Sequence, residues 1–424
     1  MDTIFALSSG KPPAGIAVVR VTGPRAADAV AALAGRVPSP RKALHAMLRG
    51  SDGAVLDDGL VLWFPGPSSV TGEDVAEFHL HGGKAIVAAV LAELASLDGL
   101  REAEAGEFTR RGFANGKIDL AEAEGLADLL EAETELQRQA AMASAGGALS
   151  RQIEEWREQL LRLSVEVEAV LDFEDEDDVS GLSEGFYERL QALRNELEAV
   201  ATRPTTEVLR EGFRVVIAGP PNTGKSTLFN DLVGSEAAIT APLAGTTRDV
   251  LTRPVAIGGV PFLFVDTAGL REGGEDQIES IGIARAHGEL AKSDLVLWLG
   301  PEGEGPEGAL EVDAQADNTA VARKARPDVR LSAHTGEGMD ILRVKLIETA
   351  KGSMPKPGEN ALNARQSRLV NVAEESLRNG QDLCDPLLIA EALRLARRAF
   401  DDLLGRTATD DVLDALFGRF CIGK

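Results

Sequence analysis

The sequence carries a glycine-rich loop with the residue types that hold nucleotide phosphates. Gly219, Gly224, Lys225 and Ser226 stand at the spacing G-x-x-x-x-G-K-S, directly after the apolar run 213–218 and before a predicted helix. The backbone N–H groups of such a loop surround phosphate oxygens, the lysine adds a positive charge at the β- and γ-phosphates, and the serine hydroxyl can bind Mg²⁺. A glycine-rich turn without a ligand is the alternative, and the flanking strand and helix argue against it.

Residues further along indicate a GTPase. Thr247 lies in the loop sequence G-T-T-R-D, and Asp266 and Gly269 belong to a D-T-A-G sequence at the end of an apolar strand. Thr247 can complete the Mg²⁺ shell when a γ-phosphate is present, Asp266 can hold the metal through water, and the Gly269 N–H can sense the γ-phosphate. A plain ATPase has no need of the threonine at this place.

Two short segments are candidates for recognition of the guanine base. Where GTPases have N-K-x-D, this chain has A-Q-A-D ending at Asp317, so the aspartate that accepts hydrogen bonds from the base is kept and the Asn and Lys are not. Ser332, Ala333 and His334 resemble the S-A-x loop that supports guanine from the other side. The alternative is that Asp317 is an ordinary acid of a surface loop. The combination favours GTP, with weakened affinity for the base.

The residue that orients the attacking water is not fixed by spacing. Leu270 follows D-T-A-G, so the glutamine of the Ras pattern is missing there. Glu272, Glu275, Asp276 and Glu279 are the acids of this region that could take its place. Spacing alone does not choose among them.

Composition bounds the class of protein. The chain has 424 residues, 44% of them hydrophobic, which suits two or three packed domains. A net charge of −24 argues against a protein that coats nucleic acid unaided. We find no apolar run long enough to cross a membrane and no charged leader, so we expect a soluble protein with no membrane partner. Two cysteines, Cys384 and Cys421, make no disulfide framework, and the cytoplasm is the expected location.

Periodicity divides the chain into three kinds of sequence. Residues 1–117 mix short β-like runs with helix, 118–211 and 351–424 are helical, and 212–350 carry the nucleotide motifs. Within the last of these, two apolar runs joined by Gly-Gly predict an antiparallel hairpin over 250–265. The simplest organisation is one helical domain made of two separated segments, with an α/β nucleotide domain inserted between them.

The whole chain resembles the MnmE (TrmE) tRNA-modification GTPases. The resemblance rests on six sequence motifs in order that flank the GTPase motifs. They are D-T-I-F-A at 2–6, G-I-A-V-V-R-V-T-G at 15–23, T-G-E-D-V-A-E at 71–77, H-G-G at 81–83, G-E-F-T-R-R-G-F-A-N-G-K at 106–117 and F-C-I-G-K at 420–424. The resemblance implies an α/β folate-binding N-terminal domain that dimerises, an α-helical domain and an inserted Ras-like P-loop GTPase domain.

The resemblance also implies a reaction. Such enzymes are K⁺-dependent GTPases that work as homodimers with a flavoprotein of the MnmG (GidA) type, in a heterotetramer or larger assembly. Together they add an aminomethyl-type group, such as carboxymethylaminomethyl, to C5 of the wobble uridine in certain tRNAs. A tetrahydrofolate derivative supplies the carbon, and 5-formyl-tetrahydrofolate is its analogue.

Folate contacts are carried over from the family onto matching positions. Arg20, Glu77, Lys117 and the last residue, Lys424, resemble the family's folate-binding residues, and Cys421 matches the cysteine of its C-terminal motif. A charged pair and further cations suit a pterin with a glutamate tail. Taken singly, Arg20 and Glu77 could instead be surface residues of a half-buried sheet.

The family's nucleotide contacts are carried over in the same way. The resemblance selects Glu279 to orient the water, assigns Mg²⁺ to Ser226 and Thr247, and places K⁺ beside the phosphate loop. The K⁺ ligands would be Asn222, Ala241, Leu243 and Thr246, with alanine standing where the family has a polar residue. The expected GTP-binding positions are Asn222, Thr223, Gly224, Lys225, Ser226, Thr227, Ala241, Pro242, Leu243, Ala244, Gly245, Thr246, Thr247, Asp266, Thr267, Ala268, Gly269, Asp317, Ser332, Ala333 and His334.

Two other functions compete with this one. A regulatory GTPase of ribosome assembly would do no modification chemistry, but no K-homology segment follows the nucleotide domain. A scaffold with a decayed nucleotide site is the other, suggested by the altered N-K-x-D. A zinc site at His79 and His81 is disfavoured because no third ligand stands at metal spacing.

Overall fold

The computed structural model describes residues 2–172, 181–234, 237–238, 251–266, 288–318, 323–356, 358–381, 383 and 385–424. The chain forms two compact units, each assembled from segments that are distant in the sequence. The first contains Met1–Ala127, Ser150–Glu154 and Phe400–Lys424, and the second contains Asp128–Leu149 and Glu155–Ala399. None of the described helices is long and apolar enough to cross a membrane.

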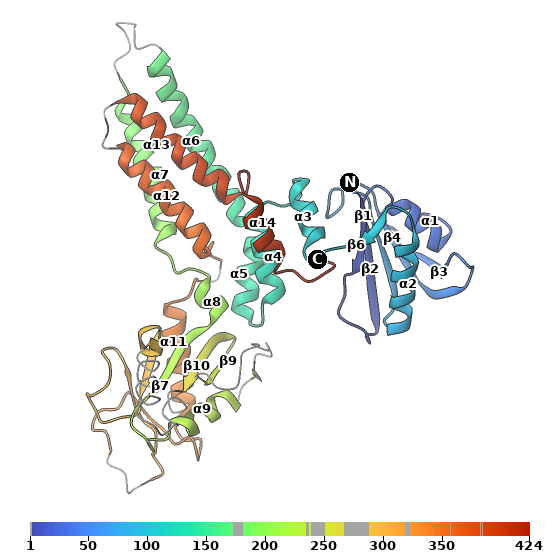
Figure 1. The fold of residues 1–424 in the computed structure, drawn as a ribbon. Helices are drawn as coiled ribbons and strands as arrows, with labels where there is room; N and C mark the ends of the chain where they lie inside the picture. Colours follow the sequence, from blue (N-terminus) through green and yellow to red (C-terminus); the bar gives the residue numbers. More distant parts are fainter. Residues whose placement is uncertain are drawn as a thin grey trace, which may run out of the picture. The chain divides into compact units, whose positions relative to one another are not determined.

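A six-stranded sheet lies at the centre of the first unit (Figure 1). In spatial order its strands are β3 (Leu44–Arg49), β4 (Val55–Phe64), β5 (Val75–His81), β2 (Ile16–Thr22), β1 (Thr3–Leu7) and β6 (Leu100–Glu102). β6 is parallel to β1, and the other neighbours are antiparallel. In β2, the fully buried Ala17, Val19 and Val21 alternate with Arg20 and Thr22. One face of the sheet is therefore apolar, and the other carries polar side chains.

Helices cover both faces of this sheet. α1 (Ala26–Ala34) and α2 (Lys84–Ser96) pack on the apolar face, where they form one core with Val19, Phe78 and their neighbours. On the other face Phe108 of α3 (Glu107–Ala114) packs with Ile4 and Ala6. α4 (Leu120–Glu131) and α14 (Asp410–Phe417) share a further cluster that includes Phe417 and Phe420.

The second unit contains a helical part and a second sheet. Its helices are α5 (Glu135–Ala145), most of α6 (Ala148–Asp172), α7 (Glu184–Ala201), α8 (Glu207–Glu211), α12 (Ala364–Gln381) and most of α13 (Pro386–Leu403). α7 and α12 pack along each other (Figure 1). The chain breaks between α4 and α5 at 132–134. Thr134 there accepts from the Gln137 N–H, and the Gln137 side chain accepts from the Thr134 N–H, which starts α5 with a capping box.

The second sheet has the strand order β13-β12-β11-β7-β10-β9-β8. The strands are β7 (Phe213–Ala218), β8 (Ala237–Ala238), β9 (Leu251–Ile257), β10 (Val260–Asp266), β11 (Leu295–Trp298), β12 (Leu310–Asp313) and β13 (Val329–Arg330). The five strands from β13 to β10 are parallel, and β9 and β8 continue antiparallel. Helices α9 (Lys225–Gly234) and α11 (Met339–Gly352) contribute to the core of this sheet.

This arrangement confirms the multidomain fold class and the hairpin predicted over 250–265. β7 lies between β10 and β11. After β7 the chain first forms the strands on the β10 side of the sheet and then those on the β11 side. Ligands of such sheets bind at the carboxyl ends of the strands at this reversal. The predicted domain boundaries at 117, 211 and 350 remain predictions.

Candidate functional site

The phosphate loop connects the end of β7 with the first residue of α9. Three of its residues have positive φ angles, Gly219 at 149°, Asn222 at 62° and Gly224 at 92°. A Cβ on Gly219 would lie 3.0 Å from the Gly300 nitrogen and 3.1 Å from the Leu299 carbon, so glycine is required there on steric grounds as well. The helix begins at Lys225, and its free N–H groups therefore face the loop.

Lys225 and Ser226 are held in place by groups of the same site. Lys225 is 7% exposed, and its Nζ donates to the Pro220 carbonyl oxygen at 2.6 Å. The Ser226 hydroxyl donates to Asp266 Oδ2 at 3.0 Å, and Asp266, at the end of β10, is 2% exposed. The structure thus brings together a hydroxyl and a carboxylate that are far apart in the sequence. Oxygen ligands of this kind fit Mg²⁺.

The predicted base-binding residues also meet. A backbone bridge joins Gln315 to Ser332, and the Ala316 N–H donates to the Leu331 carbonyl oxygen at 2.9 Å. A hydrogen bond from the Ser332 hydroxyl lowers the pKa of Asp317, and His334 and Arg323 act in the same direction. Asp317 therefore remains a carboxylate, which is the form that accepts from the N–H groups of guanine.

A pocket of about 420 Å³ opens beside the phosphate loop. Asn222 and Thr223 line it from the loop, and Ala314 and Gln315 line it from the segment that follows β12. The Gln315 side chain reaches the loop itself, since its Nε2 donates to the Asn222 carbonyl oxygen at 2.9 Å. Sequence reasoning treated this position only as a missing lysine.

The predicted folate residues are partly brought together. Arg20 Nε and Nη2 donate to Glu77 Oε1 at 3.0 and 2.8 Å, across the paired strands β2 and β5. The Arg20 guanidinium also lies 5.8 Å from the centroid of the Phe108 ring, and His79 Nε2 lies 3.3 Å from Glu77 Oε2. Because the side chains of Arg20 and Glu77 are only 23% and 17% exposed, they form a half-buried pair.

Lys117 and Lys424 lie on other segments of the first unit. Lys117 lies after α3, and its Cε would lie 3.1 Å from a Cβ on Gly72. The C-terminal tail is ordered against the sheet, since Ile422 bridges to Ala105 and Gly423 packs on the end of β1. Glu77 lines a pocket of about 320 Å³, whereas Lys117 lines a different one of about 470 Å³.

Comparison with known proteins identifies the family. The family descriptions "GTP-binding protein TrmE N-terminus" and "MnmE helical domain" match residues 3–117 and 120–421. The chain belongs to the MnmE family of tRNA modification GTPases. Two relatives named tRNA modification GTPase MnmE, from Erythrobacter litoralis and Novosphingobium aromaticivorans, are 59% and 58% identical to it over the full length of both chains.

The solved structure of the G domain of the FeoB iron transporter of T. maritima aligns with 32% of this chain and with 98% of its own length. The sequence identity is 25%. With a TM-score of 0.24, this likeness supports no further conclusion.

Several predicted positions of the family's nucleotide site lie outside the described residues. They are Ala241, Pro242, Leu243, Ala244, Gly245, Thr246, Thr247, Thr267, Ala268, Gly269, Leu270, Glu272, Glu275, Asp276 and Glu279. Their assignments to GTP, Mg²⁺, K⁺ and the attacking water remain predictions.

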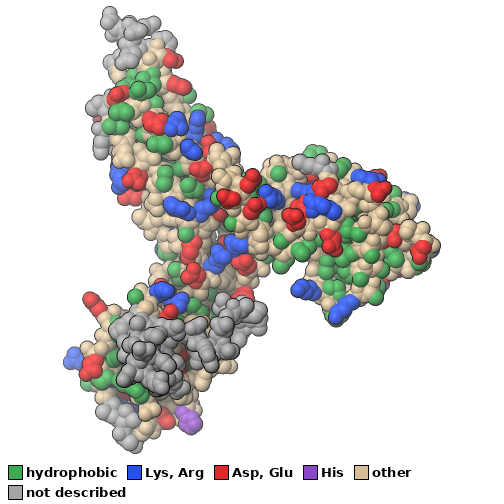
Figure 2. Space-filling model, viewed as in Figure 1, with side chains coloured by type: hydrophobic (Ala, Val, Ile, Leu, Met, Phe, Trp, Pro, Cys, Tyr) green, Lys and Arg blue, Asp and Glu red, His purple; other side chains and the backbone are tan. Residues whose placement is uncertain are grey.

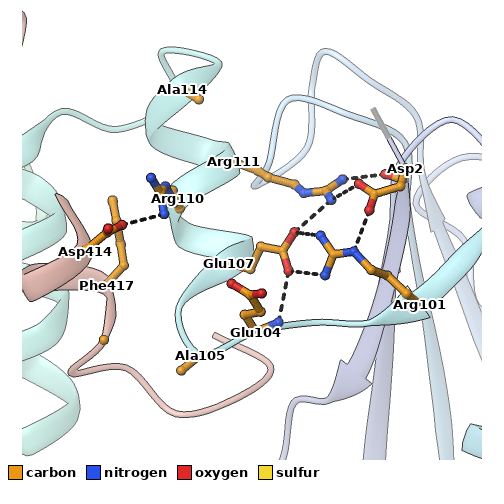
Figure 3. Close-up of a pocket in the computed structure, with 11 residues that line it drawn as sticks. Asp2, Arg101, Glu104, Ala105, Glu107, Arg110, Arg111, Ala114, Asp414 and Phe417 are labelled. Carbon is orange, nitrogen blue, oxygen red and sulfur yellow. Dashed lines mark hydrogen bonds and ion pairs between the residues drawn. The ribbon is translucent and has the colours of Figure 1, made fainter. Parts of the chain in front are cut away.

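An ion-pair network next to the N-terminal sheet was missed by sequence reasoning (Figure 3). Arg101 binds Asp2 and Glu107, and Arg111 binds Asp2, Glu107 and Glu73 at 2.8, 2.9 and 3.2 Å. Burial alone would raise the pKa of Glu107, but hydrogen bonds from the two arginines hold it below its usual value. The hydrogen bond from Arg101 likewise lowers the pKa of Asp2. Because the two arginines bridge these three carboxylates, the network holds α3 and Asp2 to the sheet.

Proposed function

We propose that this chain is a K⁺-dependent GTPase that modifies C5 of the wobble uridine in certain tRNAs, together with a flavoprotein of the MnmG type. The modification would be an aminomethyl-type group whose carbon comes from a tetrahydrofolate derivative, and the active form would be a cytoplasmic homodimer. The observation that carries the proposal is the full-length identity of 59% to a tRNA modification GTPase, in a chain that has both a phosphate loop and a polar N-terminal site.

The residues around the phosphate loop would bind and orient GTP. Backbone N–H groups at the start of α9 and the Lys225 ammonium face the phosphates, and Asp317 accepts from the base. Mg²⁺, held by Ser226 and through water by Asp266, supplies positive charge at the β- and γ-phosphates when it is bound. The hydrogen bond between Ser226 and Asp266 supports this role, because it keeps both oxygens directed to one place.

Two further groups would act on the hydrolysis step. Glu279 would orient the attacking water, because no glutamine follows D-T-A-G. Asn222 would offer its side-chain oxygen to K⁺, with Ala241, Leu243 and Thr246 around the ion. A monovalent cation there offsets the charge that develops between the phosphates, as an arginine finger does in other GTPases.

The N-terminal face would bind the folate. A carboxylate such as Glu77 matches the paired N–H donors of a pterin, and the cations Arg20, Lys117 and Lys424 suit the carboxylates of its glutamate tail. The partial burial of the Arg20–Glu77 pair supports this role. Two charged side chains that served only the protein surface would not need to be held in a half-buried site.

Contact with tRNA would depend on a local patch or on the partner protein. The chain has a net charge of −24. On the face shown in Figure 2, acidic and basic side chains of the coloured residues are interspersed, with no broad basic field. A flavoprotein partner with a basic surface would supply the phosphate contacts that this face does not offer.

Nucleoside mass spectrometry of tRNA tests the proposal. A strain that lacks the gene should lose the modified wobble uridine, and the wild-type gene should restore it. The variant Lys225→Met, which keeps an unbranched side chain one atom shorter and loses the charge, should fail to restore it. Wobble uridine that is unaltered in the deletion strain would refute the modification function.

Turnover in KCl and NaCl at equal ionic strength tests the K⁺ requirement separately. We expect hydrolysis only in KCl. Equal rates in the two salts would refute that part of the proposal and leave the modification untouched.

A further inference from the structure

The segment that follows β12, residues 314–317, is called the base loop here. It is joined to the phosphate loop by the Gln315 side chain, whose Nε2 donates to the Asn222 carbonyl oxygen at 2.9 Å. Gln315 also lies over Gly224, since its Cγ and Nε2 are 3.7 Å from the place where a Cβ on that glycine would be. The uncharged side chain of Gln315 therefore connects the base loop to the phosphate loop.

This hydrogen bond fixes the orientation of one peptide group in the phosphate loop. In a trans peptide the carbonyl and the next N–H point in opposite directions. With the Asn222 carbonyl turned toward Gln315, the Thr223 N–H points away from that side chain and is left free for a ligand of the loop. Asn222 has a φ of 62°, so this peptide group belongs to a turn that needs support to hold its shape.

A second side chain holds the base loop from its other side. Arg323 Nη1 donates to the Gln315 carbonyl oxygen at 3.0 Å, and Nη2 donates to the Ala316 carbonyl oxygen at 2.6 Å. The guanidinium also lies 3.7 Å from Asp313 Oδ1. A planar fork that binds two successive carbonyls restricts the backbone between them and the residue that follows. That residue is Asp317.

Ala314 explains why the loop needs this support. Alanine has no polar atom, so it cannot tie the base loop to its surroundings by a side-chain hydrogen bond. Gln315 and Arg323 provide three such bonds instead, one to the phosphate loop and two to carbonyls of the base loop.

We propose that Gln315 and Arg323 are positioning residues for the guanine nucleotide. Gln315 keeps the phosphate loop in its binding conformation, and Arg323 sets the place of Asp317 and hence the choice of base. The inference rests on the proposed recognition of guanine by Asp317. It gives a role to Gln315, which stands where N-K-x-D has its lysine, and to Arg323, which belongs to no motif of the sequence.

The two roles predict different effects on GDP and IDP, which differ only in the 2-amino group of the base. Gln315→Glu keeps the shape but removes the donor and sets a carboxylate against the Asn222 carbonyl. Affinity for both nucleotides should fall by about tenfold, the scale of one lost hydrogen bond, and the GDP-to-IDP ratio should stay constant. Gln315→Lys restores a donor and should return both affinities to within about twofold of the wild type.

Arg323→Met should act on the ratio instead. Without the fork, Asp317 is less well placed to accept from the 2-amino group, so GDP should lose affinity and IDP should lose little. The preference for GDP should fall at least threefold, a change of roughly 0.7 kcal/mol. Arg326→Met is the matched control, because Arg326 lies in the same connection and its side chain donates no hydrogen bond among the described residues.

Titration of the full-length chain with fluorescent and unlabelled GDP and IDP measures all these constants, and the thermal midpoint of each unliganded variant shows that it folds. Wild-type affinities for Gln315→Glu, or no recovery in Gln315→Lys, would overturn the role of Gln315. An unchanged preference in Arg323→Met, or an equal loss in Arg326→Met, would overturn the role of Arg323. A wild-type chain that bound GDP and IDP equally would refute guanine recognition by Asp317 itself.

Discussion

The C-terminal tail offers a substitution that should detach Lys424 without unfolding the protein. Gly423 has a φ of 92°, and a Cβ at this position would overlap the Leu7 carbonyl group, with 2.9 Å to its carbon and 3.0 Å to the Ser8 Cα. Backbone atoms cannot turn away as a side chain can. Gly423→Ala should therefore displace the tail from the end of β1.

The energies favour displacement over strain. A left-handed conformation costs an L-residue roughly 1–2 kcal/mol, before the overlap with Leu7 is counted. The contacts that hold the tail contribute little free energy. Ile422 is 62% exposed, and its backbone bridge to Ala105 contributes about 1 kcal/mol per hydrogen bond. Phe420 is 4% exposed and should stay anchored, so the displacement should end at the last few residues.

The assay is calorimetric titration with 5-formyl-tetrahydrofolate. If the Lys424 ammonium makes one charge-assisted contact with the ligand, its loss should weaken binding by roughly 10- to 100-fold. Deleting residues 421–424 should have the same effect, and GTP hydrolysis should not change in either variant. Gly35→Ala is the control, because Gly35 has a similar φ of 74° but open space around it. Unchanged folate affinity in Gly423→Ala would refute a place for the tail in the pocket.

Three further substitutions test other parts of the molecule. Glu279→Ala should leave GTP binding nearly intact and lower turnover by about 100-fold or more, and a parallel loss of binding would instead indicate a structural role. Ser226→Ala should raise the Mg²⁺ concentration for half-maximal turnover by about tenfold, and an unchanged requirement would contradict the Ser226–Asp266 metal site. Asp57→Asn tests the pair of Asp57 with His81. Hydrogen bonds from His81 outweigh the effect of burial and hold the pKa of Asp57 below 3.8, and Asp57 raises the pKa of His81 above 6.5. The stabilisation that Asp57 contributes is lost as pH falls through its lowered pKa. The stabilisation that His81 contributes is lost as pH rises through its raised pKa. The substitution should thus lower the melting temperature more at about pH 5.5 than at about pH 9, and equal losses would contradict the pairing.

Features that depend on neighbouring residues could be predicted from the sequence alone. The phosphate loop is one, because its glycines, lysine and serine lie within eight positions and their backbone angles follow from residue type. Helices are another, since α7 (Glu184–Ala201) lies in the segment 118–211 that periodicity predicts to be helical. Motifs in order along the chain also predicted the family, which the comparisons confirm.

Only the tertiary structure decided which distant residues meet. The register of β2 with β5 pairs Arg20 with Glu77 across 57 positions, and sheet order brings Gln315 to Asn222 across 93. Arg111 reaches Asp2 across 109 positions. Each residue taken singly is an ordinary polar side chain, and its partner is set by strand register and loop packing. A side-chain pattern with a period of two or 3.6 residues carries no information about either, so these contacts could not be read from the sequence.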